Sequence, residues 1–133
     1  TGAAGGLGFA FLSYTNAVLE SGVKIILEET KLESFIKNAD FVITGEGRLD
    51  GQTVMGKAPI GVAEIAKKYE KKVLAFGGCV AEDATLCNQH GIDAFFPILR
   101  TVTTLKEAMD FNHAKENLSA AVEQVFRLIQ SFE

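Results

Sequence analysis

Four charged side chains lie within one short, glycine-rich segment, Thr44 to Lys57, whose sequence is T-G-E-G-R-L-D-G-Q-T-V-M-G-K. Arg48 offers a planar fork that can bind a phosphate or carboxylate through two parallel hydrogen bonds, and Lys57 offers a compact positive charge. Glu46 and Asp50 could hold magnesium through their oxygens, or one of them could accept a proton from a hydroxyl group. The segment is therefore a candidate site for a small anionic ligand.

Permissive and polar residues surround these charges. Glycine lets the backbone approach a ligand closely, and neutral side chains add hydrogen-bonding groups. The alternative is a solvated loop whose charges neutralise one another and whose polar side chains only stabilise the turn. We favour binding because a solvated loop rarely needs so many glycines. The candidate binding residues are Gly45, Gly47, Gln52, Thr53, Gly77 and Gly78.

A second glycine-rich segment opens the chain, with Gly2, Gly5, Gly6 and Gly8 preceding a predicted helix. Its backbone N–H groups could face an anion, and the positive end of the helix would add a favourable potential. The segment lacks the G-x-x-x-x-G-K-[ST] pattern of a phosphate-binding loop. Tight packing of the helix is an equally good explanation of these glycines.

The remaining sequence alternates between strand and helix patterns. We expect strands at Val23–Leu27, Phe41–Thr44, Val73–Phe76 and Ala94–Leu99. We expect helices at 7–22, 30–39, 59–69, 82–90 and 103–109, and a last helix from residue 112 onward. Thr30 and Glu33 form a capping box, Pro59 suits a first helical turn, Thr103 or Thr104 can cap the fifth helix, and Asn112 can cap the last. The last helix has a stripe of apolar residues that we expect to be buried: Leu118, Val122, Val125, Leu128, Ile129 and Phe132.

This alternation predicts an α/β fold, in which a parallel sheet lies between flanking helices. Parallel strands joined by crossovers end at the same edge of the sheet. The charged segment and Gly77-Gly78 should therefore face one ligand crevice at that edge.

Composition limits the classes of function. The 133 residues have 47% hydrophobic residues and a net charge of −4, which indicates one globular unit without the basic surface that nucleic acid or an anionic membrane requires. No segment resembles a signal peptide or a membrane span, so we expect a cytoplasmic protein. Cys79, Cys87 and His90 offer fewer ligands than a structural zinc site needs, and we expect reduced, inert thiols. We expect neither His90 nor His113 to be a catalytic base.

Three blocks of sequence resemble the glycerate kinase family of bacterial type. They are G-A-A-G-G-L-G at Gly2–Gly8, D-F-V-I-T-G-E-G-R-L-D-G-Q-T at Asp40–Thr53 and G-K-A-P-I-G-V-A at Gly56–Ala63. The resemblance implies ATP-dependent phosphorylation of D-glycerate, at the 2-hydroxyl to give 2-phosphoglycerate, with magnesium accompanying the nucleotide. Members of the family are longer and have two α/β domains that meet at a cleft. Residues 1–133 resemble their C-terminal third.

Phosphoryl transfer depends mainly on positioning two substrates and offsetting charge, which suits this set of residues. By chemical type, Arg48 and Lys57 are assigned to phosphate or the glycerate carboxylate, and Glu46 or Asp50 to magnesium or the hydroxyl proton. Without the N-terminal part of the protein, we expect these residues to be inactive and to expose apolar surface that favours association of copies.

Two other functions stay open. One is a nucleotide-binding domain of a dehydrogenase or flavoprotein, although a full G-x-G-x-x-G followed by a ribose-binding acid is missing. The other is a non-catalytic ligand-binding or assembly domain.

Overall fold

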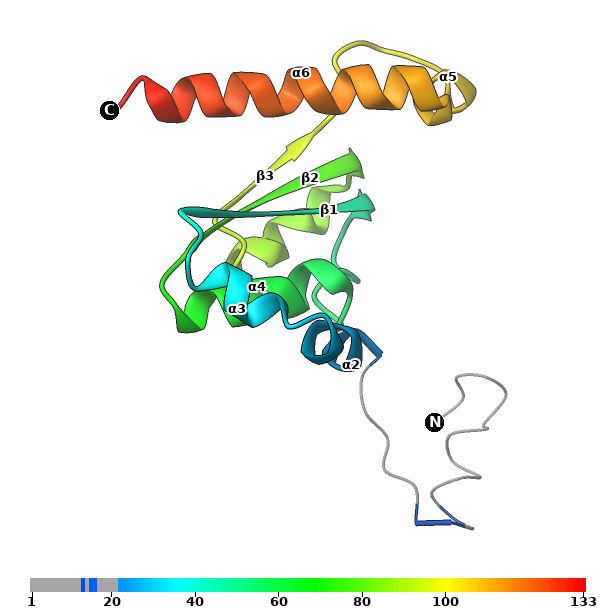
Figure 1. The fold of residues 1–133 in the computed structure, drawn as a ribbon. Helices are drawn as coiled ribbons and strands as arrows, with labels where there is room; N and C mark the ends of the chain where they lie inside the picture. Colours follow the sequence, from blue (N-terminus) through cyan, green and yellow to red (C-terminus); the bar gives the residue numbers. More distant parts are fainter. Residues whose placement is uncertain (1–12, 14, 17–21) are drawn as a thin grey trace.

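The computed structural model describes residues 13, 15–16 and 22–133, which form a three-stranded sheet with helices on both sides (Figure 1). The strand order is β1-β2-β3, and both pairs of strands are parallel. This confirms the predicted α/β fold with a parallel sheet. The described elements are α2 (Gly22–Glu29), α3 (Leu32–Ile36), β1 (Phe41–Leu49), α4 (Ala58–Lys68), β2 (Lys72–Val80), the 3-10 helix η2 (Glu82–His90), β3 (Ala94–Pro97), α5 (Leu105–Met109) and α6 (Phe111–Gln130).

The main hydrophobic core lies between the sheet and α4. Val42 of β1 is paired with Val73 of β2, and alternation along the strands places both on the face that packs against Ile60 and Ala63 of α4. Each large apolar side chain buried in this way contributes about 1.5–3 kcal/mol to folding. Pro59 lies in the first turn of α4, as predicted, where a missing N–H costs no hydrogen bond.

Helix α6 lies over the opposite face of the sheet, and Figure 1 shows it on the side away from α2, α3 and α4. Phe41 of β1 meets Phe126 of α6 edge to face, with ring centroids 6.0 Å apart, and Phe76 stacks on Phe96 of β3 at 5.6 Å. No residue of α6 is fully buried. The predicted buried stripe is therefore wrong for three of its members, since Leu118, Leu128 and Phe132 are exposed.

The predicted strand at Val23–Leu27 is wrong, because these residues lie in helix α2. Gly22 is the first residue of α2, whereas we expected it to end a preceding helix. The reason is tertiary packing: a Cβ atom on Gly61 of α4 would lie 2.6 Å from Val23 Cγ1 and 2.9 Å from Leu27 Cδ1. Val23 and Leu27 are one helical turn apart and both contact α4 at this glycine.

Two of the predicted helix caps also differ. Thr30 does not cap α3; its hydroxyl donates to the Ile26 carbonyl of α2, and Glu33 accepts a hydrogen bond from the Tyr69 hydroxyl instead. The last helix is capped by Asp110, whose carboxylate accepts from the His113 N–H, rather than by Asn112. Thr104 caps α5 as predicted, since its hydroxyl accepts from the Glu107 N–H.

The expected first helix falls almost wholly outside the described residues, and so do Gly2, Gly5, Gly6 and Gly8. Within the described part of the chain, no helix is both long enough and apolar enough to cross a membrane.

Candidate functional site

The first half of the charged segment is strand rather than loop. We expected the strand to end at Thr44, but β1 continues to Leu49, and β2 runs beside it to Val80. Glu46 therefore lies opposite Gly77, and Arg48 lies opposite Cys79. The predicted loop at Gly77-Gly78 is wrong for the same reason, since both glycines are inside β2.

A close approach of β1 and β2 explains why residue 78 is a glycine. A Cβ atom on Gly78 would lie 2.6 Å from the backbone oxygen of Gly47, a distance that no side chain tolerates without movement of the backbone. Glycine at this position therefore lets β1 and β2 stay paired up to the end that carries the charges.

A tight turn follows β1 and is organised by Asp50. Its Oδ1 atom accepts from the N–H groups of Gln52 at 3.0 Å and Thr53 at 3.2 Å. The Thr53 hydroxyl in turn accepts from the Asp50 N–H at 3.1 Å, and the Thr53 side chain is fully buried. Of the two explanations that the sequence left open for Thr53, stabilisation of the turn is the one that these contacts support. Gln52 is exposed, and its backbone contributes to the same turn.

Both cations of the segment converge on Asp50. Arg48 Nε lies 3.2 Å from Asp50 Oδ2, and Lys57 Nζ lies 4.0 Å from Asp50 Oδ1. The Asp50 side chain is 16% exposed, whereas those of Arg48 and Lys57 are 63% and 40% exposed. Two cations thus share one carboxylate, and both cations are more exposed to solvent than Asp50 is.

The surroundings of Asp50 keep it ionised. Partial desolvation acts to raise its pKa, but the charge of Lys57, the N–H groups of Gln52 and Thr53, and the charge of Arg48 together lower the pKa below its ordinary value. Asp50 is therefore a fixed negative charge that orients the two cations.

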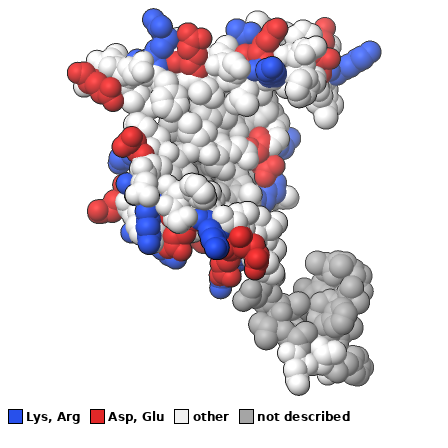
Figure 2. All heavy atoms as spheres, in the orientation of Figure 1, with Lys and Arg blue, Asp and Glu red and all other residues white. Residues whose placement is uncertain are grey.

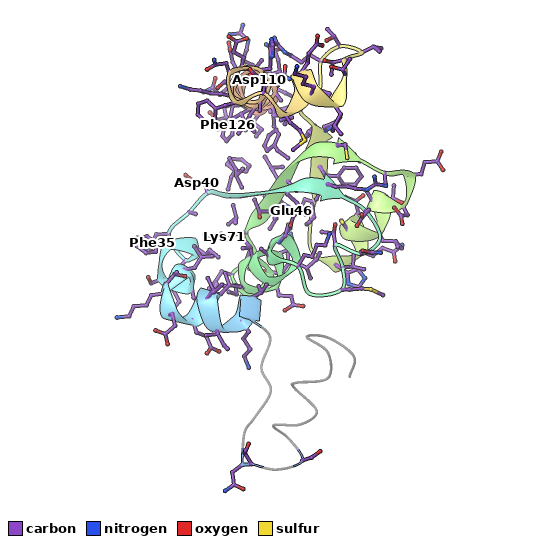
Figure 3. The ribbon with its side chains drawn as sticks, turned by 90° about the vertical axis from the view of Figure 1, so that its right-hand side faces the viewer. Phe35, Asp40, Glu46, Lys71, Asp110 and Phe126 are labelled. Carbon is purple, nitrogen blue, oxygen red and sulfur yellow. The ribbon has the colours of Figure 1, made fainter. Side chains whose placement is uncertain are left out.

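Glu46 precedes Arg48 by two residues on β1, so both lie on the same face of the strand. Figure 3 shows Glu46 in the central part of the molecule, between the layer of α6 and the layer of α4. Glu46 Oε1 accepts from the Gly47 N–H at 3.1 Å, and no described residue donates to Oε2. Glu46 is therefore the carboxylate of the segment with an oxygen left for a ligand.

Asp50 and Glu46, the two predicted magnesium ligands, differ in how many of their oxygens already have a partner. Both oxygens of Asp50 are engaged, one by the N–H groups of the turn and the other by Arg48. Glu46 has a free oxygen, and Mg²⁺ commonly takes only one or two carboxylates together with waters and substrate phosphates. Among the described residues no group of three or more acidic, histidine or cysteine side chains could hold a metal by itself. The segment therefore fits a magnesium ion only as a donor of one or two carboxylate oxygens, and the free oxygen of Glu46 is the more accessible of these.

The cysteines near the site are free thiols. Cys79 is exposed at the end of β2, and Cys87 is buried below the turn, with its Sγ atom 3.9 Å from the Asp50 carbonyl oxygen. Burial raises the pKa of Cys87, and the negative charge of Asp50 raises it further. Cys87 is therefore held as the unreactive thiol.

The turn around Asp50 is the part of the site that sequence reasoning missed. The signal was present in D-G-Q-T, because an Asp side chain often accepts hydrogen bonds from backbone groups two and three residues later. We predicted Glu46 or Asp50 as the contact of magnesium or the hydroxyl proton, and the structure adds that Asp50 contacts the turn, Arg48 and Lys57.

Comparisons with known proteins identify the family of this chain. The model of the glycerate kinase family matches residues 1–130. The chain is 46% identical over 124 residues to a glycerate kinase of Bacillus subtilis, covering 93% of this chain and 32% of the relative. It is 46% identical over 120 residues to a glycerate 2-kinase of Escherichia coli, covering 90% of this chain and 31% of the relative.

A solved structure gives the same result in three dimensions. A protein described as glycerate kinase 2 from Salmonella typhimurium LT2 matches 98% of this chain with a TM-score of 0.69 and 38% identity, while this chain covers 31% of it. The chain thus spans about a third of the length of the relatives that it matches. By its sequence and its fold, this chain belongs to the glycerate kinase family.

Proposed function

We propose that these residues form the C-terminal α/β portion of a two-domain kinase that transfers the terminal phosphoryl group of ATP to D-glycerate. The identity of 46% with the Bacillus subtilis glycerate kinase, over 93% of the chain, carries this proposal. The name of the Escherichia coli relative, glycerate 2-kinase, supports the 2-hydroxyl as the acceptor and 2-phosphoglycerate as the product. The alternatives of a dinucleotide-binding domain and a non-catalytic domain have no such support.

In this proposal Arg48 and Lys57 bind the anionic groups of the substrates. Arg48 pairs with Asp50 through Nε, and no described residue forms a hydrogen bond with its terminal amino groups. Those groups can bind a phosphate or the glycerate carboxylate through two parallel hydrogen bonds, and Lys57 adds a second positive charge. Preorganised cations of this kind stabilise the charge on a phosphoryl group in transfer.

Glu46 is proposed to act on the attacking hydroxyl or on the magnesium ion. Its free oxygen can accept the proton of the attacking hydroxyl or bind the magnesium ion that accompanies ATP. When bound, that ion would neutralise charge on the phosphates. Asp50 is proposed to position the two cations, because its oxygens already contact the turn and Arg48.

The glycines are proposed to let the ligands approach the backbone. Gly45 and Gly47 of β1 and Gly77 and Gly78 of β2 flank the charges at one end of the sheet. Gln52 is exposed beside them and can donate to a ligand. Gly2, Gly5, Gly6 and Gly8 lie outside the described residues, and a role in binding phosphate remains a proposal from the sequence alone.

A chimera tests the proposed function. This chain replaces the matching third of the Escherichia coli glycerate 2-kinase, and the purified chimera is incubated with ATP, magnesium and D-glycerate. We expect phosphorus NMR to show 2-phosphoglycerate, and we expect much less product when L-glycerate replaces D-glycerate. A folded chimera that forms no phosphoglycerate, while the parent enzyme forms it under the same conditions, would contradict the proposal.

A further inference from the structure

Thr53 lies at the base of the charged segment, in the turn that follows β1. Its side chain is fully buried, and among the described residues no other polar or charged residue is so completely removed from solvent. It has no exposed atom with which to contact a substrate. An effect of Thr53 on the reaction must therefore pass through a neighbouring residue.

The hydrogen bonds of Thr53 in the described part of the chain all join it to Asp50. The Thr53 hydroxyl accepts from the Asp50 N–H at 3.1 Å and donates to Asp50 Oδ1 at 3.4 Å. The Thr53 N–H donates to the same carboxylate oxygen at 3.2 Å and to the Asp50 carbonyl at 3.0 Å. Any residue except proline supplies an N–H, whereas the two contacts of the side chain need a hydroxyl at this position. The hydroxyl therefore adds its own hold on the backbone and the carboxylate of Asp50.

The 3-10 helix η2 holds the same turn from another side. Cys87 Sγ lies 3.9 Å from the Asp50 carbonyl oxygen. A Cβ atom on Gly51 would lie 2.5 Å from Asp83 Oδ2, so the backbone of the turn lies directly against η2. Asp50 is thus fixed both within the turn and by the element on which the turn packs.

Exposure increases from Thr53 outward to the cations. The Asp50 side chain is 16% exposed, that of Lys57 is 40% exposed and that of Arg48 is 63% exposed. Figure 2 shows acidic and basic side chains close together at the side of the molecule where β1 and β2 end in Figure 1. Long, exposed cations have many rotamers, and a fixed carboxylate partner limits them before a ligand binds. The position of Asp50 therefore sets where the two positive charges lie.

We propose that Thr53 is a positioning residue of the kinase, acting through Asp50. Its hydroxyl fixes the carboxylate, which in turn fixes Arg48 and Lys57 for the anionic groups of the substrates. This inference rests on the proposed function, because it assigns a role in the binding of those groups. A displacement of about 1 Å can cost about a hundredfold in rate, so loss of the hydroxyl should be visible in catalysis.

Two substitutions separate the hydroxyl of Thr53 from its packing. In the chimera, Thr53→Val keeps the branched shape without the hydroxyl and should lower kcat/KM about tenfold to a hundredfold. Thr53→Ser keeps the hydroxyl without the methyl group and should lose at most about threefold, which is less than the displacement of the cations would cost. Greater loss in Thr53→Ser than in Thr53→Val, or no loss in Thr53→Val, would overturn the inference.

Two further variants complete this comparison. Thr53→Ala also lacks the hydroxyl and needs less room, so it replaces Thr53→Val if that variant does not fold. Thr101→Val makes the same change at an exposed threonine outside the charged segment and should keep the kcat/KM of the parent chimera. An equal loss in Thr101→Val and Thr53→Val would contradict the assignment to Thr53.

A double-mutant cycle shows whether Thr53 acts through the cations. In a chimera that already carries Arg48→Ala, the loss of kcat/KM caused by Thr53→Val should be at least about threefold smaller than in the parent chimera, because the contact that it supports is gone. Equal losses in the two backgrounds would show that Thr53 only stabilises the fold.

Nuclear magnetic resonance tests the same inference without activity. Arginine labelled with ¹⁵N gives a signal for the Arg48 Nε–H group, which is identified by its absence in Arg48→Lys. This signal should shift in Thr53→Val and keep its parent position in Thr53→Ser, because Asp50 is the partner of that group. A signal that does not move in Thr53→Val would overturn the inference. An inactive chimera whose signal responds as expected would contradict the proposed function alone.

Discussion

At the scale of single residues, the site is organised around Asp50. Its two oxygens hold the backbone of the turn and pair with Arg48 and Lys57, which are the more exposed members of the group. The carboxylate that remains available to a ligand is Glu46. We therefore propose that Asp50 positions the cations and that Glu46 is the reactive carboxylate.

Glu46→Gln separates these roles. The amide oxygen can still accept from the Gly47 N–H, so the melting temperature of the chimera should not change. The turnover number should fall about 10²-fold to 10⁴-fold, because the amide accepts no proton and binds magnesium poorly. Steady-state kinetics and thermal melting of the same preparation check both statements. Turnover like that of the parent chimera would show that Glu46 only supports the strand.

At the scale of elements, the sequence predicted the parallel α/β order, where β1 and β2 begin, and a helix with Pro59 in its first turn. It failed where tertiary contacts decide the structure. Val23 and Leu27 belong to a segment with high strand propensity, but contact with α4 at Gly61 selects a helix. Gly77-Gly78 has the composition of a loop, but the close approach of Gly78 to Gly47 keeps it in the strand.

The candidate site could be predicted only in part from the sequence. The types and spacing of Glu46, Arg48 and Lys57 are visible in the sequence. The pairing of the cations with Asp50 depends on where β1 ends and the turn begins. We predicted that β1 ends at Thr44, whereas it ends five residues later, at Leu49.

Gly78→Ala tests the close approach of the strands. The new methyl group would lie 2.6 Å from the Gly47 oxygen, so β1 and β2 must separate, and we expect a loss of about 1–3 kcal/mol in the free energy of unfolding. Gly47→Ala is the matched control, because its Cβ atom would have no neighbour within 4 Å. Urea titration of the two variants should show the larger loss in Gly78→Ala, and the reverse order would contradict the strand pairing at this point.

Asp93→Asn tests the link between α4 and β2. Asp93 Oδ2 accepts from Lys67 Nζ and from the Val73 N–H. Desolvation acts to raise the Asp93 pKa, but these two hydrogen bonds and the nearby positive charges together lower it. A carboxyl group with a lowered pKa stabilises the fold above its unfolded pKa, and this stabilisation is lost as the pH falls through the folded pKa.

The variant should therefore be less stable than the parent chain by about 1 kcal/mol at pH 7, the scale of one partly exposed charged hydrogen bond. The difference should disappear as the pH falls below the ordinary range for a carboxyl group. Thermal melting between pH 3 and pH 7 measures it, and a constant difference over that range would contradict the role of the charge.

At the scale of the whole molecule, the described residues leave large apolar side chains in solvent. Leu105, Met109 and Phe111 lie at the junction of α5 and α6 and are more than 70% exposed, and Phe132 follows the end of α6 with 85% exposure. α6 buries none of its residues fully. We expect this apolar surface to contact other protein.

The chain alone should therefore bind an apolar dye such as ANS and associate at high concentration, and dye fluorescence per molecule should fall in the chimera. Fluorescence titration and light scattering check the two statements. A monodisperse chain that binds no dye would show that this surface needs no cover.

Kinetics of Arg48→Ala in the chimera test the central claim, that the charged segment at the end of β1 is where the phosphoryl group is handled. We expect kcat/KM for D-glycerate and ATP to fall about tenfold to a thousandfold, which is the scale of one lost transition-state contact, while the melting temperature stays nearly unchanged. We expect Arg48→Lys to restore only part of the lost kcat/KM. Arg127→Ala, at an exposed arginine of α6, is the matched control and should keep the parent value. A stably folded Arg48→Ala chimera with a kcat/KM near that of the parent would contradict the account.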